Sequence, residues 1–136
     1  MSNIEQTLSI IKPDAVERNL QDQIKSEFKN SGFEILKEKK IHISKEEAEK
    51  FYKVHESKPF YNDLCAYLSS GPIVVMNLQR ENAVLENRKL MGATNPEDAE
   101  EGTLRKKYGI SIDKNSVHGS DSVENAKIEL DFFFKD

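Results

Sequence analysis

The sequence lacks the features that stabilise or anchor many small proteins. It has one cysteine, Cys65, in 136 residues, so no disulfide can form within the chain. No run approaches the roughly 20 apolar residues of a membrane-spanning helix. The opening MSNIEQTLSI also lacks the basic and apolar regions of a secretion signal. We therefore expect a cytoplasmic protein that does not bind membranes, with a core large enough to fold without disulfides.

Positive charge is not in excess either. Twenty Lys and Arg residues stand against 24 Asp and Glu residues, which gives a formal net charge of −4. This balance argues against a general surface for nucleic acid or anionic lipid, so an anion would have to meet a local basic cluster. No predicted strand has the aromatic-rich pattern of RNA-recognition sheets, and we expect no specific nucleic-acid partner.

The order of predicted elements indicates the fold class. No linker, repeat or low-complexity tract divides the chain, which predicts one domain over residues 1–136. Apolar patterns and turn residues predict the following elements. Strands are expected at 7–12, 33–43 and 73–76, with a short segment at 116–118, and helices at 20–31, after a capping box at Ser44, at 62–69, at 82–91 and from Asp121 or Ser122 onward.

Strands that alternate with helices favour the α+β class, with helices covering an antiparallel sheet of the ferredoxin-like βαββαβ plan. Periodicity alone leaves a doubly wound parallel sheet as an alternative. The broken alternation over 33–43 predicts a bulge or bend in that strand. The polar stretch 96–116 is expected to be a loop with one helical turn around Leu104.

Three histidines are candidates for chemistry. His42 alternates with apolar strand neighbours and should be solvated, while His55 continues the apolar stripe of a helix and is expected to be a packing residue. His118 stands beside Gly119, just before a helix N-terminus that favours phosphate, so it could carry a phosphoryl group. The alternative role for His118 is to cap the helix. Glu129 lies eleven residues further on and could orient the ring.

Other chemistry is poorly supported by the residues. No grouping of His, Cys or carboxylates has metal-ligand spacing, and Cys65 is expected to be a packing residue. No glycine-rich phosphate loop is present, so side chains would have to bind any phosphate. Lys12, Arg88 and Arg105 are the basic candidates, and the alternative for each is a solvated charge.

The segment NSVHGSDS (115–122) resembles the active-site signature of nucleoside diphosphate kinases. Further blocks are similar to the family's and follow in the family's order. They are TLSIIKPDAV (7–16), Lys58-Pro59-Phe60, SGPIVVMNL (70–78), GATNPEDA (92–99) and GTLR (102–105). The resemblance covers nearly the whole chain and implies the ferredoxin-like fold.

The resemblance implies a ping-pong transfer of the γ-phosphoryl group of a nucleoside triphosphate to His118, and from there to a nucleoside diphosphate. By the same resemblance, Glu129 orients the catalytic ring, and Tyr52 and Ser120 lie near the transferred group. Lys12 and Asn115 match positions on the sugar-hydroxyl side, and Lys12 also lies close to the transferred phosphoryl group.

The remaining substrate contacts are also assigned by resemblance. Phe60 matches the residue that stacks on the base, which implies low base specificity. The phosphate clamp is matched by Arg88, Thr94 and Arg105. Mg²⁺ is expected to arrive on the nucleotide phosphates without a protein cage, with Asp121 at most a water-mediated neighbour.

Assembly is less defined by the sequence. Members of the family form dimers grouped into tetramers or hexamers, so a homo-oligomer is expected. The segment 20–24 lacks a usual glycine, Glu101 stands where hexameric members often have proline, and the C-terminal end is short. Ile128 and Phe132 lie opposite the main apolar face of the last helix, where they could form a subunit contact. The intact signature argues against a silent nucleotide-binding relative.

Overall fold

Two long strands, β1 (Ile4–Ile11) and β3 (Ile73–Glu81), pair antiparallel at the centre of a sheet. β2 (Glu34–Ile41) pairs with β3, and the short β4 (Val117–Gly119) pairs with β1, both antiparallel. The protein is represented by a computed structural model that describes residues 4–110 and 116–134. The strand order within these residues is β2-β3-β1-β4.

This order confirms the ferredoxin-like prediction and excludes the doubly wound alternative, because every strand pair in the described residues is antiparallel. The central strands are longer than predicted. β1 begins at Ile4 and β3 continues to Glu81, because polar residues extend both strands. Gln6 pairs with Gln79 in register and donates a hydrogen bond to it (Nε2 to Oε1, 3.4 Å). Apolar patterning cannot reveal such a polar pair.

Helices connect all the strands. The α-helices are α1 (Pro13–Glu17), α2 (Gln21–Asn30), α3 (Lys45–Phe51), α4 (Tyr61–Leu68), α5 (Ala83–Met91), α6 (Leu104–Tyr108) and α7 (Val123–Phe134), and the short 3-10 turns are η1 (Lys53–His55) and η2 (Pro96–Asp98). Among these helices, within the described ranges, none combines the length and apolar character needed to cross a bilayer.

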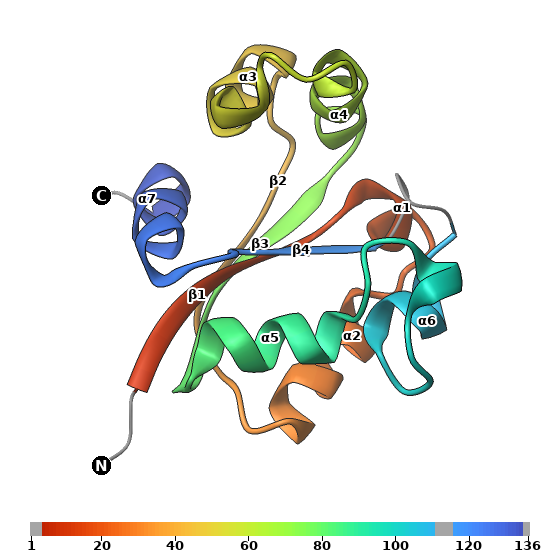
Figure 1. Ribbon diagram of the computed structural model, residues 1–136, viewed down its shortest axis with the longest axis vertical. Coiled ribbons are helices and arrows are strands. Elements are labelled where there is room, and N and C mark those ends of the chain that lie inside the picture. The colour runs from red at the N-terminus through yellow and green to blue at the C-terminus, as the bar shows by residue number, and fades with distance from the viewer. Residues whose placement is uncertain (1–3, 111–115, 135–136) are drawn as a thin grey trace.

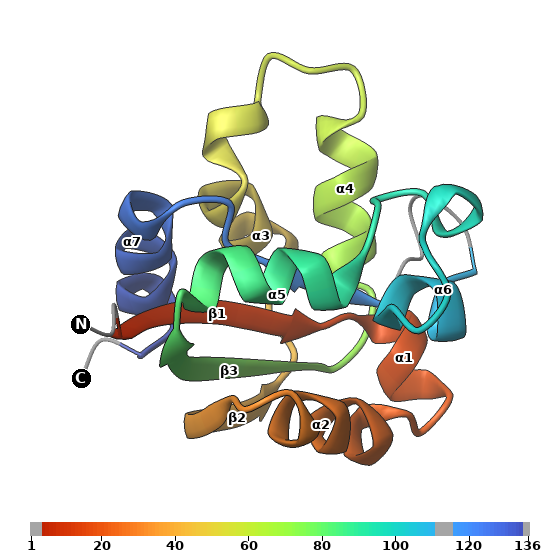
Figure 2. The ribbon, with the colours of Figure 1, turned by 60° about the horizontal axis from the view of Figure 1, so that its bottom comes forward.

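The helices cover both faces of the sheet. α3, α4 and α7 lie on one face, and α2 and α5 lie on the other (Figures 1 and 2). Side chains of a strand alternate between its faces, so β3 contributes to two cores. Val74, Met76 and Leu78 point to the α2 and α5 side, while Ile73 and Val75 point to the α3, α4 and α7 side.

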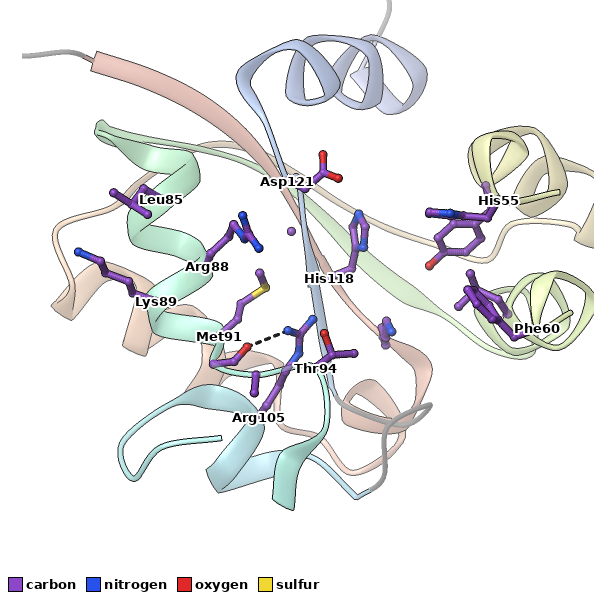
Figure 3. A pocket seen from close by; sticks show the side chains of 16 residues that line it. His55, Phe60, Leu85, Arg88, Lys89, Met91, Thr94, Arg105, His118 and Asp121 are labelled. Atoms are coloured by element: carbon purple, nitrogen blue, oxygen red, sulfur yellow. Dashed lines mark hydrogen bonds between the residues drawn. The ribbon is translucent and has the colours of Figure 1, made fainter. Parts of the chain in front are cut away.

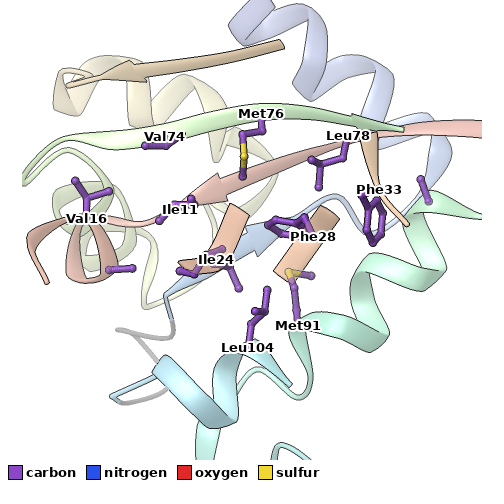
Figure 4. Packing of buried hydrophobic residues seen from close by; sticks show 13 residues of the cluster. Ile11, Val16, Ile24, Phe28, Phe33, Val74, Met76, Leu78, Met91 and Leu104 are labelled. Atoms are coloured by element: carbon purple, nitrogen blue, oxygen red, sulfur yellow. The ribbon is translucent and has the colours of Figure 1, made fainter. Parts of the chain in front are cut away.

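The core on the α2 and α5 side fixes the base of the functional region. Ile24 and Phe28 of α2 are fully buried and pack with Met76 of β3 (Figure 4). Leu104 of α6 and Met91 of α5 join the same cluster. This packing holds α5 and α6 in fixed positions beside β4, where the site is built.

Several local predictions are confirmed in detail. Ser44 accepts a hydrogen bond from the backbone N–H of Glu47, and the Glu47 carboxylate accepts one from the backbone N–H of Ser44, which completes the predicted capping box. The register of β2 shifts between Ile35 and Lys37, where an irregularity was expected. Ser122 caps α7 by accepting a hydrogen bond from the backbone N–H of Asn125 (3.0 Å).

Candidate active site

A pocket of about 820 Å³ lies beside β4, between α5 on one side and the α3–α4 pair on the other (Figure 3). Segments that are far apart in the sequence contribute its walls. The predicted site residues that line it are Lys12, Tyr52, Phe60, Arg88, Thr94, Arg105 and His118. Ser120 and Glu129 lie behind His118 and contact it or each other. Asn115 lies outside the described residues.

His118 projects from β4 into the middle of this pocket (Figure 3). Its Nε2 lies 3.3 Å from Oε1 of Glu129 on α7, which is the contact expected from the sequence. Because a carboxylate can only accept a hydrogen bond, this contact assigns the proton of a neutral ring to Nε2. The lone pair of Nδ1 is then available as a nucleophile.

Ser120 fixes the strand immediately after His118. Its backbone N–H donates to the Leu8 carbonyl (3.2 Å), and its hydroxyl oxygen accepts from the Leu8 N–H (3.3 Å). The same hydroxyl donates to Oε1 of Glu129 (2.8 Å). Ser120 therefore connects β1, β4 and the carboxylate that holds the histidine ring.

Close packing of α5 against β4 requires a small residue at position 119. A Cβ atom added to Gly119 would lie 2.3 Å from Nδ2 of Asn87 and 2.7 Å from Cε of Met91. The glycine thus lets α5 approach β4. That approach brings Arg88, the residue after Asn87, to the wall of the pocket beside His118.

Arg105 is buried beneath the pocket, with 9% of its surface exposed. Its guanidinium donates to two backbone carbonyls, from Nη1 to Gly92 and from Nη2 to Val117, both at 3.0 Å (the contact with Gly92 is dashed in Figure 3). Burial lowers the pKa of Arg105 to about 10, so the group still carries its charge at neutral pH. Among the residues that the structure describes, its Nε has no hydrogen-bond partner. The residue thus joins the end of α5 to β4 and has donor capacity left for an anion.

Because the chain is net negative, an anion was expected to bind a local basic cluster, and the pocket contains one. Lys12, Arg88, Lys89 and Arg105 all line it, against one carboxylate among the described lining residues, Asp121. Cations grouped in a concave site attract phosphate even on a protein with a net negative charge. Lys12 and Arg105 are buried, so neither is a solvated surface charge, whereas Arg88 is exposed and its phosphate role stays a prediction.

The opposite wall is aromatic. Phe60 precedes α4 and is 47% exposed, with the Lys58 Nζ 5.7 Å from its ring centre. Tyr52 is buried, and its ring centre lies 6.3 Å from that of His118. Burial and the nearby Glu129 carboxylate raise the pKa of Tyr52, so its hydroxyl stays protonated and can donate.

His55 was predicted to be a packing residue, but it also lines the pocket. Its ring centre lies 6.1 Å from that of Tyr52 and 6.3 Å from that of Phe60. Burial, followed by the charges of Lys58 and His118, lowers its pKa. The signal was present in the sequence, because His55 follows Tyr52 on the same stripe. That stripe borders both the core and the pocket.

Other lining residues were not predicted, namely Leu64, Leu85, Lys89, Met91 and Ala93. The remaining two candidates behave as expected. His42 is exposed and makes a 2.7 Å contact with the Ser69 carbonyl, and Cys65 is a buried free thiol in the core. Within residues 4–110 and 116–134, no group of three or more His, Cys, Asp or Glu side chains could hold a metal ion.

Comparison with known proteins identifies the family. The family model described as "Nucleoside diphosphate kinase" matches residues 5–136. A nucleoside diphosphate kinase from Rhizorhabdus wittichii is 56% identical over 131 residues, which are 96% of this chain and 94% of that protein. The Aquifex aeolicus nucleoside diphosphate kinase structure superposes with a TM-score of 0.96 at 37% identity, covering 97% of this chain and 96% of that chain. A structure of the Encephalitozoon cuniculi enzyme gives 0.93 at 38% identity, covering 97% and 90%. The chain belongs to the nucleoside diphosphate kinase family.

Proposed function

We propose that this phosphotransferase carries the γ-phosphoryl group of a nucleoside triphosphate on Nδ1 of His118 and then delivers it to a nucleoside diphosphate. The observation that supports this role most strongly is the contact between His118 Nε2 and Glu129 (3.3 Å) inside a pocket lined by cations. This contact leaves Nδ1 as the unprotonated nitrogen. A histidine without such a partner could present either nitrogen.

In the first half-reaction, the Nδ1 lone pair attacks the γ-phosphorus. The bond between that phosphorus and the β–γ bridging oxygen breaks, and the nucleoside diphosphate leaves with the bonding electrons. The Nε2 proton remains hydrogen-bonded to Glu129, whose charge offsets the charge gained by the ring. In the second half-reaction, a β-phosphate oxygen of another diphosphate attacks the phosphorus, and the P–N bond breaks.

The cationic and hydroxyl groups around His118 are proposed to hold the phosphates. Arg88, Thr94 and Arg105 approach from the α5 side, where fixed guanidinium groups can follow charge spread over the equatorial oxygens of the transition state. Lys12 approaches from the end of β1 on the side of the transferred group and the sugar. Tyr52 and Ser120 are proposed to act close to the transferred group, and by resemblance Asn115 binds the sugar.

Phe60 is proposed to stack on the base and to give low base specificity. Its exposed ring offers an apolar face that any base can stack on, without hydrogen bonds that select one base. The base would then lie at the mouth of the pocket, with one face on the Phe60 ring and the other face toward solvent.

Replacing Phe60 with alanine is expected to raise the dissociation constants of ADP, GDP, CDP and UDP by about tenfold each. At saturation, turnover should change by less than about threefold, because the phosphates are held elsewhere. Isothermal titration with the four diphosphates measures the first effect, and Phe60→Tyr is the matched control that keeps a stacking ring. A loss confined to one base would contradict the stacking role.

Mg²⁺ is proposed to enter with the nucleotide, because this ion prefers phosphate oxygens and keeps several waters. The residues present fit that mode, since Asp121 is the one carboxylate among the described lining residues and could contact such an ion through water. When bound, the ion neutralises phosphate charge. Arg88 and Arg105, which line the pocket, would contact the same phosphates.

We further propose one domain over residues 1–136 that assembles into dimers grouped as tetramers or hexamers in the cytoplasm. The family match over residues 5–136 and the shared sheet support the single domain. A buried free thiol at Cys65 is usual in a reducing compartment. Exposed apolar residues on α7 support a subunit contact, because Ile128 is 67% and Phe132 38% exposed.

Changing Ile128 to glutamate is expected to lower the mass of the assembly, because a carboxylate would be buried without a partner at the contact. Light scattering coupled to gel filtration measures this mass. Lys127→Glu places the same charge at the neighbouring exposed position and should leave the mass unchanged. An unchanged mass for Ile128→Glu would place the subunit contact elsewhere.

The histidine role is tested by intact-mass spectrometry of the protein mixed with ATP and Mg²⁺. One added phosphoryl group that is lost in acid and on addition of GDP is the expected result. No added group despite nucleotide binding would indicate a silent relative instead. Tight, salt-sensitive retention of RNA on a filter would favour a nucleic-acid role.

A further inference from the structure

His118 lies on a strand that is too short to define its own position. β4 spans Val117–Gly119 and pairs with β1 through three residue pairs at the edge of the sheet. Ser120 anchors the strand on its C-terminal side through Leu8 and Glu129. A second anchor is needed on the N-terminal side to fix the ring relative to the phosphate ligands.

Ser116 is the residue at that other end, and it is fully buried with a left-handed backbone (φ 75°). This conformation is costly for a residue with a Cβ atom, so the surroundings must hold it. Its carbonyl accepts a hydrogen bond from the Lys12 N–H (2.8 Å). Its hydroxyl donates to Oδ2 of Asp14 (3.2 Å) and accepts from Nη2 of Arg18 (3.2 Å).

Asp14 is the centre of this anchor. Only 5% of its surface is exposed, and it does not line the pocket. Oδ2 accepts from Ser116 and from Nη2 of Arg18 (3.2 Å), while Oδ1 accepts from the Tyr67 hydroxyl of α4. Its own N–H donates to the Tyr67 oxygen (2.9 Å). The carboxylate thus accepts from three donors, which belong to the residue after α1, to α4 and to the entrance to β4.

We propose that Asp14 is a positioning residue for phosphoryl transfer, which holds Ser116 in its left-handed conformation and thereby sets the place of His118. It lies two residues after Lys12 and acts on a residue two before His118. The Asp14 carboxylate therefore fixes the position of His118, the proposed nucleophile, relative to Lys12, a proposed phosphate ligand. The inference rests on the proposed role of His118.

The test compares Asp14→Asn with the unmodified enzyme in single-turnover phosphorylation by ATP and Mg²⁺. An Asn side chain has no charge and its nitrogen cannot accept, so the donors of Ser116, Arg18 and Tyr67 can no longer all be satisfied, and the hold on Ser116 weakens. Phosphoenzyme formation at saturating ATP should slow by about tenfold or more, since displacement of a reacting group by about 1 Å can cost about a hundredfold. The ADP dissociation constant should stay within about twofold, because no nucleotide ligand is removed.

A second substitution separates positioning from general stabilisation. Glycine adopts a left-handed backbone without steric cost, so Asp14→Asn with Ser116→Gly should regain at least about threefold in rate over Asp14→Asn alone. Tyr67→Phe removes one donor but keeps the Ser116 contact. It should lower the melting temperature while changing the phosphorylation rate by less than about twofold.

The results of these variants decide whether Asp14 positions His118 or only stabilises the fold. A phosphorylation rate for folded Asp14→Asn equal to that of the unmodified enzyme, or a slowed variant that Ser116→Gly does not improve, would overturn the positioning role. If Asp14→Asn does not fold, the rate of phosphoenzyme formation is compared between Ser116→Gly and Ser116→Ala. The positioning role predicts that Ser116→Gly is faster, and the reverse order would overturn that role. Absence of a phosphohistidine in the unmodified enzyme would instead refute the proposed function.

Discussion

Replacement of His118 with alanine is expected to lower phosphoryl transfer by at least about 10⁴-fold, because the proposed nucleophile is removed from an otherwise intact pocket. The cations that bind phosphate come from other elements, so the ADP dissociation constant should change by less than about threefold. Steady-state transfer from ATP to GDP and calorimetric ADP binding measure the two effects on the same preparation.

His42→Ala is the matched control, since it removes an exposed histidine that contacts the Ser69 carbonyl and does not line the pocket. Its activity should equal that of the unmodified enzyme within about twofold. Residual transfer by His118→Ala at a tenth of the normal rate would contradict the assignment. Such a result would direct attention to His55, the other histidine that lines the pocket.

Removal of the Arg105 side chain should have the second largest effect. Arg105→Ala is expected to reduce kcat/KM by about 10²- to 10³-fold, in line with the loss of one preorganised group that stabilises transition-state charge. The substitution also removes the hydrogen bonds to the Gly92 and Val117 carbonyls, which should cost about 2–4 kcal/mol of folding free energy. Both losses come from one buried guanidinium.

The loss should be the same for purine and pyrimidine nucleotides, because the pocket places Arg105 on the α5 side, opposite Phe60. Kinetics with four nucleoside triphosphates, together with urea unfolding, would measure both effects. Arg105→Lys keeps a charge but lacks the planar guanidinium, so it should recover little of the lost kcat/KM or of the lost folding free energy. Lys106→Ala changes an exposed neighbour and should have no effect on either measurement. A base-selective loss would contradict the phosphate-clamp assignment.

The pKa of Arg105 adds a dependence on pH. Burial disfavours the charged guanidinium and lowers its pKa to about 10, so the charge is complete at neutral pH and is lost as the pH rises through that value. The contribution of Arg105 to transfer should therefore disappear above about pH 10. The ratio of the activities of the unmodified enzyme and Arg105→Ala should fall over that range.

Local features of the fold were predictable from sequence because their causes are local. The capping box at Ser44 and the helix it starts depend on residues three positions apart. The contact between His118 and Glu129 was also predictable, because helix periodicity carries α7 back past the end of β4. Each of these predictions needed only the spacing of residues along one segment.

Non-local features could not be predicted in this way. Strand order depends on partners that lie far apart, so periodicity left the parallel sheet open until the pairing of β1 with β3 was known. Arg105 buries its charge against carbonyls of Gly92 and Val117, which no side-chain pattern encodes. The position of His55 in the pocket could not be predicted either, because the helical stripe that carries it faces both the core and the pocket.

The central claim is that Nδ1 of His118 accepts the phosphoryl group while Glu129 holds Nε2. The most direct test is ³¹P–¹⁵N NMR of the phosphoenzyme, prepared with ¹⁵N-labelled histidine and kept at neutral or basic pH. Phosphorus coupled to Nδ1 of His118 is the expected result. Phosphorus on Nε2, or an acid-stable phosphate on Ser120 without nitrogen coupling, would contradict the account.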